Sequence, residues 1–351
     1  MTLCVFKMLM GVAEVNELKK LTFIIYAYPY NKNVGGICAL HYLAHELTRL
    51  NQGEVYLTTS FTNPRWNGIG IDRDLPFFLE GDQSFYSRYY QWLTTLKKYV
   101  IFATFRRKIT RLQERIFPNL LWRHFDKNNT VVIYAEIVRC NPLNGTHVVR
   151  WIMNTPGVCG GDGIYDLSDH IFQYHPWYPV DEKYKVQSLL TAIDLDHQLK
   201  TYQNKNLPER KGGAYLVRKG RDKNHNQHPA DFVHADPLLE KMTDQEAADF
   251  FNSIETLISY DDMTFISVQA ALCGCKSIII PGEGDRSLDN LKKVNRIKGV
   301  AYGFDDQEWV QNTTHALRPQ FEAVNAENLS TIKGFYDYCE KNIPGSEITQ
   351  R

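Results

Sequence analysis

Short apolar runs and longer amphipathic segments succeed one another along the chain. The runs Leu21 to Tyr26 and Ser277 to Ile280 are rich in β-branched residues and lack polar alternation, which predicts strands buried on both faces. Between the first run and a third one, Glu54 to Thr58, the segment Ile37 to Leu50 places its apolar residues on one helical face. The chain is therefore predicted to open with a βαβ unit.

Further apolar runs predict the other strands of two α/β domains. These strands are Val131 to Ile137, His147 to Asn154, Asp169 to Tyr174, Ala214 to Val217, Phe232 to Asp236 and Glu255 to Ser259. Thr243 with Glu246 forms a capping-box pattern, which predicts the start of a helix, and Asn328 to Asn342 predicts a last helix. The polar run Gln198 to Lys211 indicates a crossover into a second domain. Within it, the segment Gln203 to Gly213 has the composition of a linker, so we expect a domain boundary near residue 206.

The segment from Ser259 to Gly274 predicts a strand end, an acidic turn and a short helix. Asp261 and Asp262 form the turn, Thr264 is a good N-cap, and Gly274 stands where a left-handed residue ends a helix. The amino end of a helix carries partial positive charge and free N–H groups, which suit a phosphate. We expect an anionic ligand and a carboxylate to meet here.

Two other segments suit phosphate binding. Gly35 and Gly36 precede the first helix, where the absence of side chains allows the backbone to approach a ligand closely. The strand Ala214 to Val217 runs into a basic turn, Arg218 to Lys223, whose fixed cations would stabilise negative charge. A plain tight turn explains the glycines equally well, and a solvated surface turn remains the alternative for the cations.

Composition and charge limit the classes of partner and cofactor that we expect for the chain. The chain has 351 residues, is 43% hydrophobic and has zero formal net charge, which fits a two-domain globular protein and gives no argument for a nucleic-acid partner. Its seven cysteines show no C-x-x-C spacing, so we expect a reduced cytoplasmic protein without a metal or other cofactor. We find no run of about 18 apolar residues and no convincing signal peptide.

The stretch Lys97 to Lys127 is basic and interleaved with aromatic residues. Its Lys and Arg residues outnumber Glu114 and Asp126. Such a segment can lie on an anionic membrane, which would make the protein peripheral at the inner face of the cytoplasmic membrane. A helix packed on its own domain with a solvated basic face is the other interpretation.

The segment Asp261 to Gly274 resembles the donor-site signature of GT-B glycosyltransferases, above all of the retaining group with two glutamates separated by seven residues. Here Asp261 and Gln269 stand at the two acidic positions, and Ala270 to Gly274 matches well. The resemblance implies two Rossmann-like domains facing a cleft: residues 1–205 on the acceptor side, 206–327 on the donor side, and a last helix, 328–351, that crosses back. It also places Asp261 near the donor sugar and Gln269 at the ribose.

The same resemblance implies that the basic turn binds the diphosphate of the donor, chiefly through Arg221 and Lys223. The donor-binding set expected on this basis is Gly35, Gly36, Arg218, Lys219, Arg221, Lys223, His234, Asp262, Thr264, Phe265 and Gln269. The alternative is that the two aspartates only shape a turn and that Gln269 faces solvent or a packed helix. Glu136 is the candidate for an acceptor-side base, although a buried carboxylate paired with Arg139 or Arg150 would explain it as well.

The order of the segments Tyr134 to Leu143, Val148 to Trp151 and Asn154 to Gly157 resembles that in bacterial surface-polysaccharide glycosyltransferases. The implied reaction moves a sugar from a nucleotide-sugar to a glycan or lipid-linked acceptor in polysaccharide or lipopolysaccharide assembly, without metal and with retention. Asp261 and Glu136 are then the catalytic candidates. A nucleotide-sugar epimerase of the same fold and a non-catalytic sugar-nucleotide-binding subunit remain as rivals.

Overall fold

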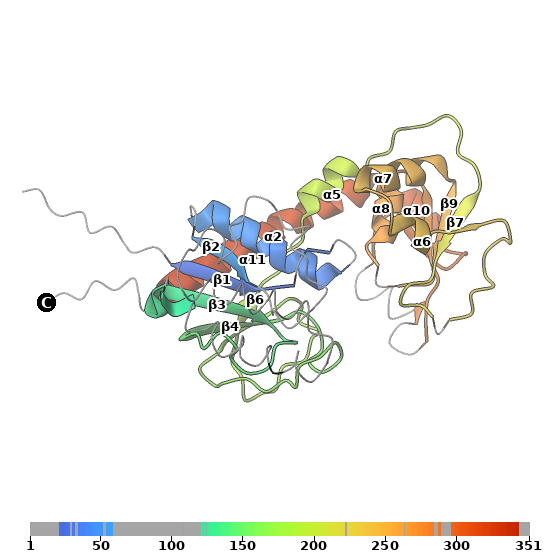
Figure 1. Ribbon diagram of the computed structural model, residues 1–351. Coiled ribbons are helices and arrows are strands. Elements are labelled where there is room, and N and C mark those ends of the chain that lie inside the picture. Colours follow the sequence, from blue (N-terminus) through green and yellow to red (C-terminus); the bar gives the residue numbers. More distant parts are fainter. Residues whose placement is uncertain are drawn as a thin grey trace, which may run out of the picture. The chain divides into compact units, whose positions relative to one another are not determined.

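The computed structural model describes residues 21–28, 30–31, 34–51, 54–58, 108, 121–123, 125–221, 223–262, 264–283, 287–288 and 296–343. The chain divides into two compact units, residues 1–192 with 330–351, and residues 193–329 (Figure 1). Each unit contains one parallel sheet, the first of six strands and the second of five. The prediction of a mixed α/β protein with two sheet-bearing parts is therefore confirmed.

The first sheet has the strand order β2-β1-β3-β4-β5-β6, and every neighbouring pair is parallel. Its strands are β1 (Thr22–Tyr26), β2 (Val55–Thr58), β3 (Thr130–Ala135), β4 (His147–Ile152), β5 (His170–Gln173) and β6 (Val186–Leu189). Helix α2 (Gly35–Asn51) connects β1 to β2. The opening βαβ unit is present as predicted, with Gly35 and Gly36 forming the first residues of the helix.

One face of the first sheet is covered by α2 and by the carboxyl part of the last helix, α11 (Leu317–Asn342) (Figure 1). Leu43 and Leu47 of α2 and Phe335 of α11 are completely buried there against Phe23 of β1. The aliphatic and aromatic residues of this face form the main core of the unit. α11 begins at Leu317, well before the predicted start at Asn328, and its first residues belong to the second unit.

The second sheet has the strand order β11-β10-β9-β7-β8, again parallel throughout. Its strands are β7 (Gly213–Leu216), β8 (Val233–His234), β9 (Thr256–Ser259), β10 (Lys276–Ile279) and β11 (Val300–Tyr302). The helices of this unit are α5 (Leu195–Thr201), α6 (Asp236–Leu239), α7 (Asp244–Ser253), α8 (Ile266–Leu272) and α10 (Gln307–Thr313). Residues of α5, α7 and α8 bury one face of the sheet.

Local signals set the ends of two helices in this unit. Thr243 and Glu246 form the predicted capping box at the start of α7. At the end of α8, the N–H of Cys275 donates to the Ala270 carbonyl at 3.0 Å and that of Gly274 donates to the Ala271 carbonyl at 2.9 Å. Gly274 has a φ of +82°, so this helix ends in a Schellman motif, as its sequence indicates.

The polar run after α5 is anchored to the second unit and does not behave as a free linker. The Asn252 side chain accepts the Lys205 N–H at 2.8 Å and donates to the Gln203 carbonyl at 3.0 Å. Arg210 donates to the Cys273 carbonyl at 2.7 Å. Because these bonds attach the run to α7 and α8, the second unit starts at Ile193, before the expected boundary at residue 206.

Two predicted segments lie mainly outside the described residues. Of the basic stretch 97–127, the structure describes only 108, 121–123 and 125–127. The sequence also predicts a helix from Leu288 to Lys298, of which only the two ends are described. Within the described part of the chain, every helix is too short or too polar to cross a membrane.

Candidate functional site

The second sheet has a topological switch point between β7 and β9. The chain leaves β7 toward β8 on one side and returns to form β9 on the other side of β7. In open parallel sheets, ligands bind outside the carboxyl ends of the strands at such a point. The basic turn Arg218 to Lys223 follows β7, and Tyr260, Asp261 and Asp262 follow β9, so the two predicted segments emerge next to each other.

The basic turn packs tightly onto the end of β9. A Cβ atom on Gly220 would lie 2.1 Å from the carbonyl oxygen of Tyr260, so only glycine fits at this position. The Gly220 N–H closes the turn by donating to the Val217 carbonyl at 2.7 Å. Arg218 has a φ of +39°, a left-handed conformation that non-glycine residues rarely adopt. The turn therefore has a fixed shape.

Asp236 at the start of α6 holds the beginning of this turn. Its Oδ2 accepts the N–H of Val217 at 2.8 Å and that of Arg218 at 3.2 Å, and it lies 3.0 Å from His234 Nε2. The basic turn and the end of β8 are thus joined through one carboxylate. Sequence reasoning included Asp236 in a predicted strand and loop but missed this role, because only the tertiary fold brings the turn to it.

The cations of the turn fall into two groups by burial. Lys223 forms a buried ion pair with Asp262 at 2.8 Å, and its Nζ also donates to the Ile280 carbonyl at 2.8 Å. Lys219 and Arg221 are exposed, and Arg218 is half-buried. Two of the three donors of Lys223 are already used inside the protein, so the exposed cations are the better phosphate ligands.

The residues predicted around the acidic turn are mostly engaged in packing. Asp261 is buried at 2% exposure. Thr264 Oγ1 accepts the Ile266 N–H at 3.3 Å, but the N-cap of α8 is Phe265 and not the predicted Thr264. The Phe265 ring packs edge-on against Phe321. Gln269 donates to the side chain of Gln198 in α5 at 2.6 Å. Because α8 has only seven residues, its amino end adds little to anion binding.

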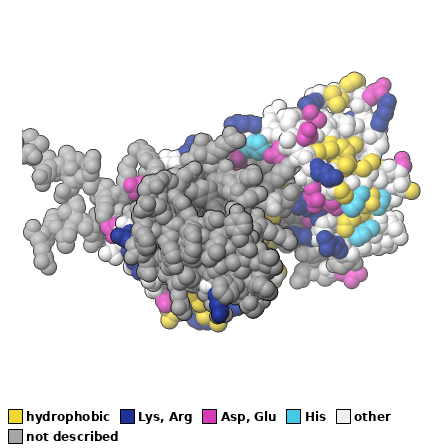
Figure 2. Space-filling model, in the orientation of Figure 1, with side chains coloured by type: hydrophobic (Ala, Val, Ile, Leu, Met, Phe, Trp, Pro, Cys, Tyr) yellow, Lys and Arg dark blue, Asp and Glu magenta, His cyan; other side chains and the backbone are white. Residues whose placement is uncertain are grey.

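A pocket of about 630 Å³ opens beside the basic turn. It is lined by Tyr215, Val217, His225, Asn226, His228, Ala230 and His234. Of the histidines only His234 was expected here, although the run His225 to His228 is visible in the sequence. The histidine side chains gather on the face of the second unit shown in Figure 2. Burial lowers the pKa of His228, and the neighbouring His225 and His234 lower it further.

The first unit carries the remaining predicted residues, at the switch point between β1 and β3. A Cβ atom on Gly36 would lie 3.9 Å from the Met153 side chain, and nothing lies within 4 Å of one on Gly35. Glu136, which follows β3, accepts the Met153 N–H at 3.0 Å. The carboxyl edge of this sheet therefore brings the amino end of α2, Met153 and Glu136 into one neighbourhood.

Glu136 is buried at 4% exposure. Burial raises the pKa of its carboxyl group, and the hydrogen bond from the Met153 N–H offsets only part of this effect. The two expected arginine partners are engaged elsewhere: Arg150 pairs with Asp169 at 2.7 Å, and Arg139 lies 3.6 Å from Asp162. Burial thus favours the protonated form of the Glu136 carboxyl group.

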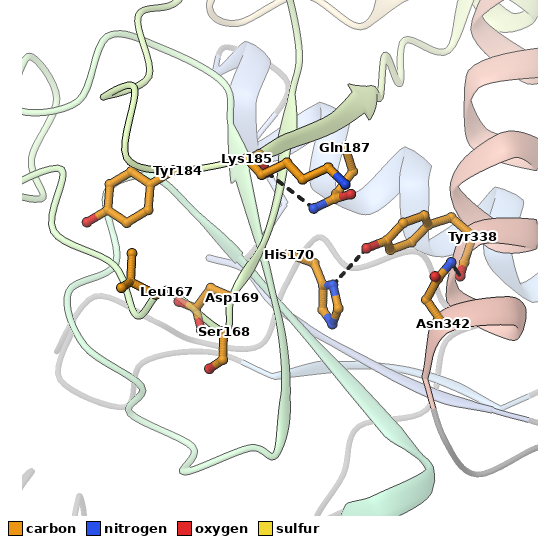
Figure 3. A pocket seen from close by; sticks show the side chains of 9 residues that line it. All are labelled: Leu167, Ser168, Asp169, His170, Tyr184, Lys185, Gln187, Tyr338 and Asn342. Carbon is orange, nitrogen blue, oxygen red and sulfur yellow. Dashed lines mark hydrogen bonds between the residues drawn. The ribbon is translucent and has the colours of Figure 1, made fainter.

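A second pocket, of about 420 Å³, lies at the opposite, amino edge of the first sheet. It is formed by residues at the starts of β5 and β6 and by Tyr338 and Asn342 of α11 (Figure 3). His170 Nδ1 lies 2.9 Å from the Tyr338 hydroxyl group across this pocket. None of the predicted site residues lines it.

Among the described residues, no cluster of three or more His, Cys, Asp or Glu side chains has the geometry to hold a metal ion. Comparison of the chain with protein-family models finds no match, and comparison with curated proteins finds none either. The local geometry of the two switch points is therefore the basis for a functional assignment.

Proposed function

We propose that the chain is a GT-B-type glycosyltransferase that transfers a sugar from a nucleotide-sugar donor to a glycan or lipid-linked acceptor. The observation that carries the proposal is the juxtaposition of exposed cations and a ring-lined pocket at the switch point of the second sheet. Cations and aromatic rings side by side are what a nucleotide needs for its phosphates and its base. The bacterial surface-polysaccharide setting rests on the sequence resemblance alone.

In the proposed reaction, the bond between the anomeric carbon and the diphosphate oxygen breaks, and its electron pair leaves with the nucleoside diphosphate. Lys219 and Arg221, which are exposed, would stabilise the negative charge that develops on this leaving group. The oxygen of the acceptor hydroxyl group forms the new bond to the anomeric carbon and gives up its proton. Glu136, with its raised pKa, is the proposed acceptor of that proton.

The burial of the acidic turn favours a second candidate, a sugar-nucleotide-binding subunit without activity. Asp261 is 2% exposed, and the Asp262 side chain is fully buried against Lys223. Neither carboxylate is presented to a donor sugar in this conformation, and Gln269 is hydrogen-bonded to Gln198. Such a protein would bind nucleotide-sugars and never release free nucleotide.

The test is a titration of the protein with UDP, GDP, TDP, CMP and their sugars, followed by measurement of nucleotide release with polysaccharide and lipid-linked acceptors. We expect micromolar to millimolar binding that weakens by about tenfold in Arg221→Ala, because one charge-assisted contact contributes about 1.5 kcal/mol. Glu136→Gln should retain binding and lose transfer. Absence of binding by every nucleotide would refute both candidates, and binding without release would select the second.

A further inference from the structure

The two exposed cations of the basic turn flank a residue that is fixed in place. Gly220 is buried between Lys219 and Arg221, whose side chains reach into solvent. The Gly220 N–H donates to the Val217 carbonyl at 2.7 Å, and the Gly220 carbonyl oxygen accepts the Lys223 N–H at 3.2 Å. The backbone positions from which the two cations extend are therefore set by the shape of the turn.

The first part of the turn is held by a carboxylate. Oδ2 of Asp236 accepts the N–H of Val217 at 2.8 Å and that of Arg218 at 3.2 Å. Nε2 of His234, at the end of β8, lies 3.0 Å from the same oxygen. The Asp236 side chain is 17% exposed, so water competes little for these bonds. One atom thus joins the end of β7, the start of the turn and the end of β8.

Arg218 has a backbone conformation that needs such support. Its φ of +39° lies in the left-handed region, which costs a non-glycine residue free energy and persists only where the surroundings hold it. The Arg218 N–H is one of the two that Asp236 accepts. Without this acceptor we expect Arg218 to relax toward negative φ, which would redirect the chain and displace the cations that follow it.

The charge of Asp236 is unfavourable for the ligand proposed at this turn. The carboxylate is hydrogen-bonded to the backbone of the same turn whose Lys219 and Arg221 are proposed to stabilise a diphosphate. Like charges at short range repel each other, so removal of the carboxylate would by electrostatics alone strengthen anion binding. Any favourable contribution of Asp236 to binding must therefore come through the geometry that it imposes on the turn.

We infer that Asp236 is a positioning residue for diphosphate binding; this inference rests on the proposed function. Its carboxylate holds the basic turn in the shape that presents Lys219 and Arg221 to the phosphates. A turn that is already ordered does not have to be ordered by the ligand, which lowers the cost of binding. Asp236 itself does not touch the ligand, and the gain from the shape exceeds the loss from charge repulsion.

Three substitutions of Asp236 separate shape from charge. Asp236→Ala removes both the charge and the acceptor. Asp236→Asn removes the charge and keeps an oxygen that can accept the two N–H groups of the turn. Asp236→Glu keeps the charge and moves the carboxylate away from these groups by the length of a methylene. Asp231→Ala removes a charge from an exposed residue on the segment before β8 and is the matched control.

The measurement is isothermal titration of the full chain with inorganic pyrophosphate, UDP, GDP, TDP and CMP at pH 7.5. We expect Asp236→Ala to bind pyrophosphate about tenfold more weakly than the wild type, because two hydrogen bonds that shape the turn are lost. Asp236→Glu should also bind more weakly. Asp236→Asn should bind as tightly as the wild type or up to about threefold more tightly, and Asp231→Ala should change the affinity by less than about twofold.

Hydrogen exchange reports the shape of the turn without any ligand. The amide protons of Val217 and Arg218 should exchange about tenfold faster in Asp236→Ala and at the wild-type rate in Asp236→Asn, while those of β10 stay protected. A thermal melt of each variant verifies folding. If Asp236→Ala does not fold, the comparison of Asp236→Asn with Asp236→Glu carries the test, because one keeps the acceptor position and the other keeps the charge.

The outcomes distinguish this inference from the proposed function. If pyrophosphate binds Asp236→Ala as tightly as the wild type, or more tightly, the positioning role is overturned and the glycosyltransferase proposal stands. Equal weakening in Asp236→Asn and Asp236→Ala would also overturn it, because the charge and not the shape would then be required. Failure of pyrophosphate and of every nucleotide to bind the wild type would overturn both.

Discussion

At the scale of single residues, burial separates charges that are paired inside the protein from charges that are accessible to solvent. Lys223 and Asp262 have side-chain exposures of 9% and 0% and hold each other at 2.8 Å. Arg221, two residues earlier, is exposed. The sequence shows both cations in one basic turn, and only the structure shows that one is buried in an ion pair and the other is exposed.

This difference gives a stability prediction. Lys223→Met removes one partner of a buried ion pair and should lower the free energy of unfolding by about 3 kcal/mol, because the buried carboxylate of Asp262 loses its ion pair with Lys223. Arg221→Met should change it by less than about 0.5 kcal/mol, since the side chain is on the surface. Urea denaturation of both variants measures the two values. A similar small effect in both would show that the buried pair contributes nothing net.

The raised pKa of Glu136 predicts how its contribution to stability depends on pH. Burial raises the folded-state pKa of Glu136 above its unfolded-state pKa. Below the unfolded-state pKa the group is protonated in both states and does not lower the free energy of unfolding. As pH rises through the folded-state pKa, the buried group must ionise and the protein loses stability. Glu136→Gln keeps the oxygen that accepts the Met153 N–H and cannot ionise. We therefore expect the variant to melt higher than the wild type at pH 7.5.

The melting temperatures of the two proteins should converge at pH 4, where Glu136 is protonated as well. Differential scanning calorimetry at both pH values measures the difference. A variant that is less stable than the wild type at pH 7.5 would mean that the ionised carboxylate is the favoured form, in conflict with its burial.

At the scale of elements, short-range signals determine the ends of helices. The Schellman motif after α8 requires the φ of +82° at Gly274, and a Cβ atom there would lie 2.5 Å from the Asn204 side chain. Gly334 lies in the interior of α11 with nothing within 4 Å of an added Cβ atom. The same chemical change at these two glycines has opposite consequences.

We expect Gly274→Ala to destabilise the second unit by about 1–3 kcal/mol through backbone strain and the contact with Asn204. Gly334→Ala, the matched control, should stabilise the protein by up to about 1 kcal/mol, because alanine is the better helix former. Chemical denaturation measures both changes. The explanation fails if Gly274→Ala is neutral or if both variants shift in the same direction.

The sequence predicted most elements and missed the strands β6 and β11 and the helices α5, α6 and α10. The apolar runs of β1, β3, β9 and β10 are buried on both faces, so their pattern is unambiguous. β6 (Val186–Leu189) is half-buried or exposed and shows no such run, because it lies at the edge of its sheet. α5 has only seven residues, and only Leu195 and Leu199 are buried, too few to show a helical period.

At the scale of the whole molecule, α11 belongs to both units. Its residues from Ser330 onward count with the first unit, where Ile332, Phe335 and Cys339 are buried at 0–1% exposure. The Phe335 ring meets Phe172 of β5 edge-on at 4.8 Å. The first unit therefore depends on a segment that follows the entire second unit in the sequence.

This dependence predicts that a change near the end of the chain acts on its beginning. Phe335→Ala should destabilise the first unit by about 3–5 kcal/mol through the cavity it leaves. Hydrogen exchange should then accelerate in β1 and β3 and stay unchanged in β9 and β10. Lys333→Ala, whose side chain is 64% exposed, is the control and should leave both sheets unchanged. Equal acceleration in both sheets would contradict the division into two units.

The sequence by itself determined the class of the protein, two parallel α/β units, because burial of strands and amphipathicity of helices are written in local periods of hydrophobicity. It also determined the start of α7 and the end of α8, which depend on a few neighbouring residues such as Thr243 and Gly274. Tertiary structure alone decided that Lys223 is buried while Arg221 is exposed, and that His225 and His228 join His234 around Tyr215. Those relations depend on contacts between segments far apart in the chain, and no local pattern encodes them.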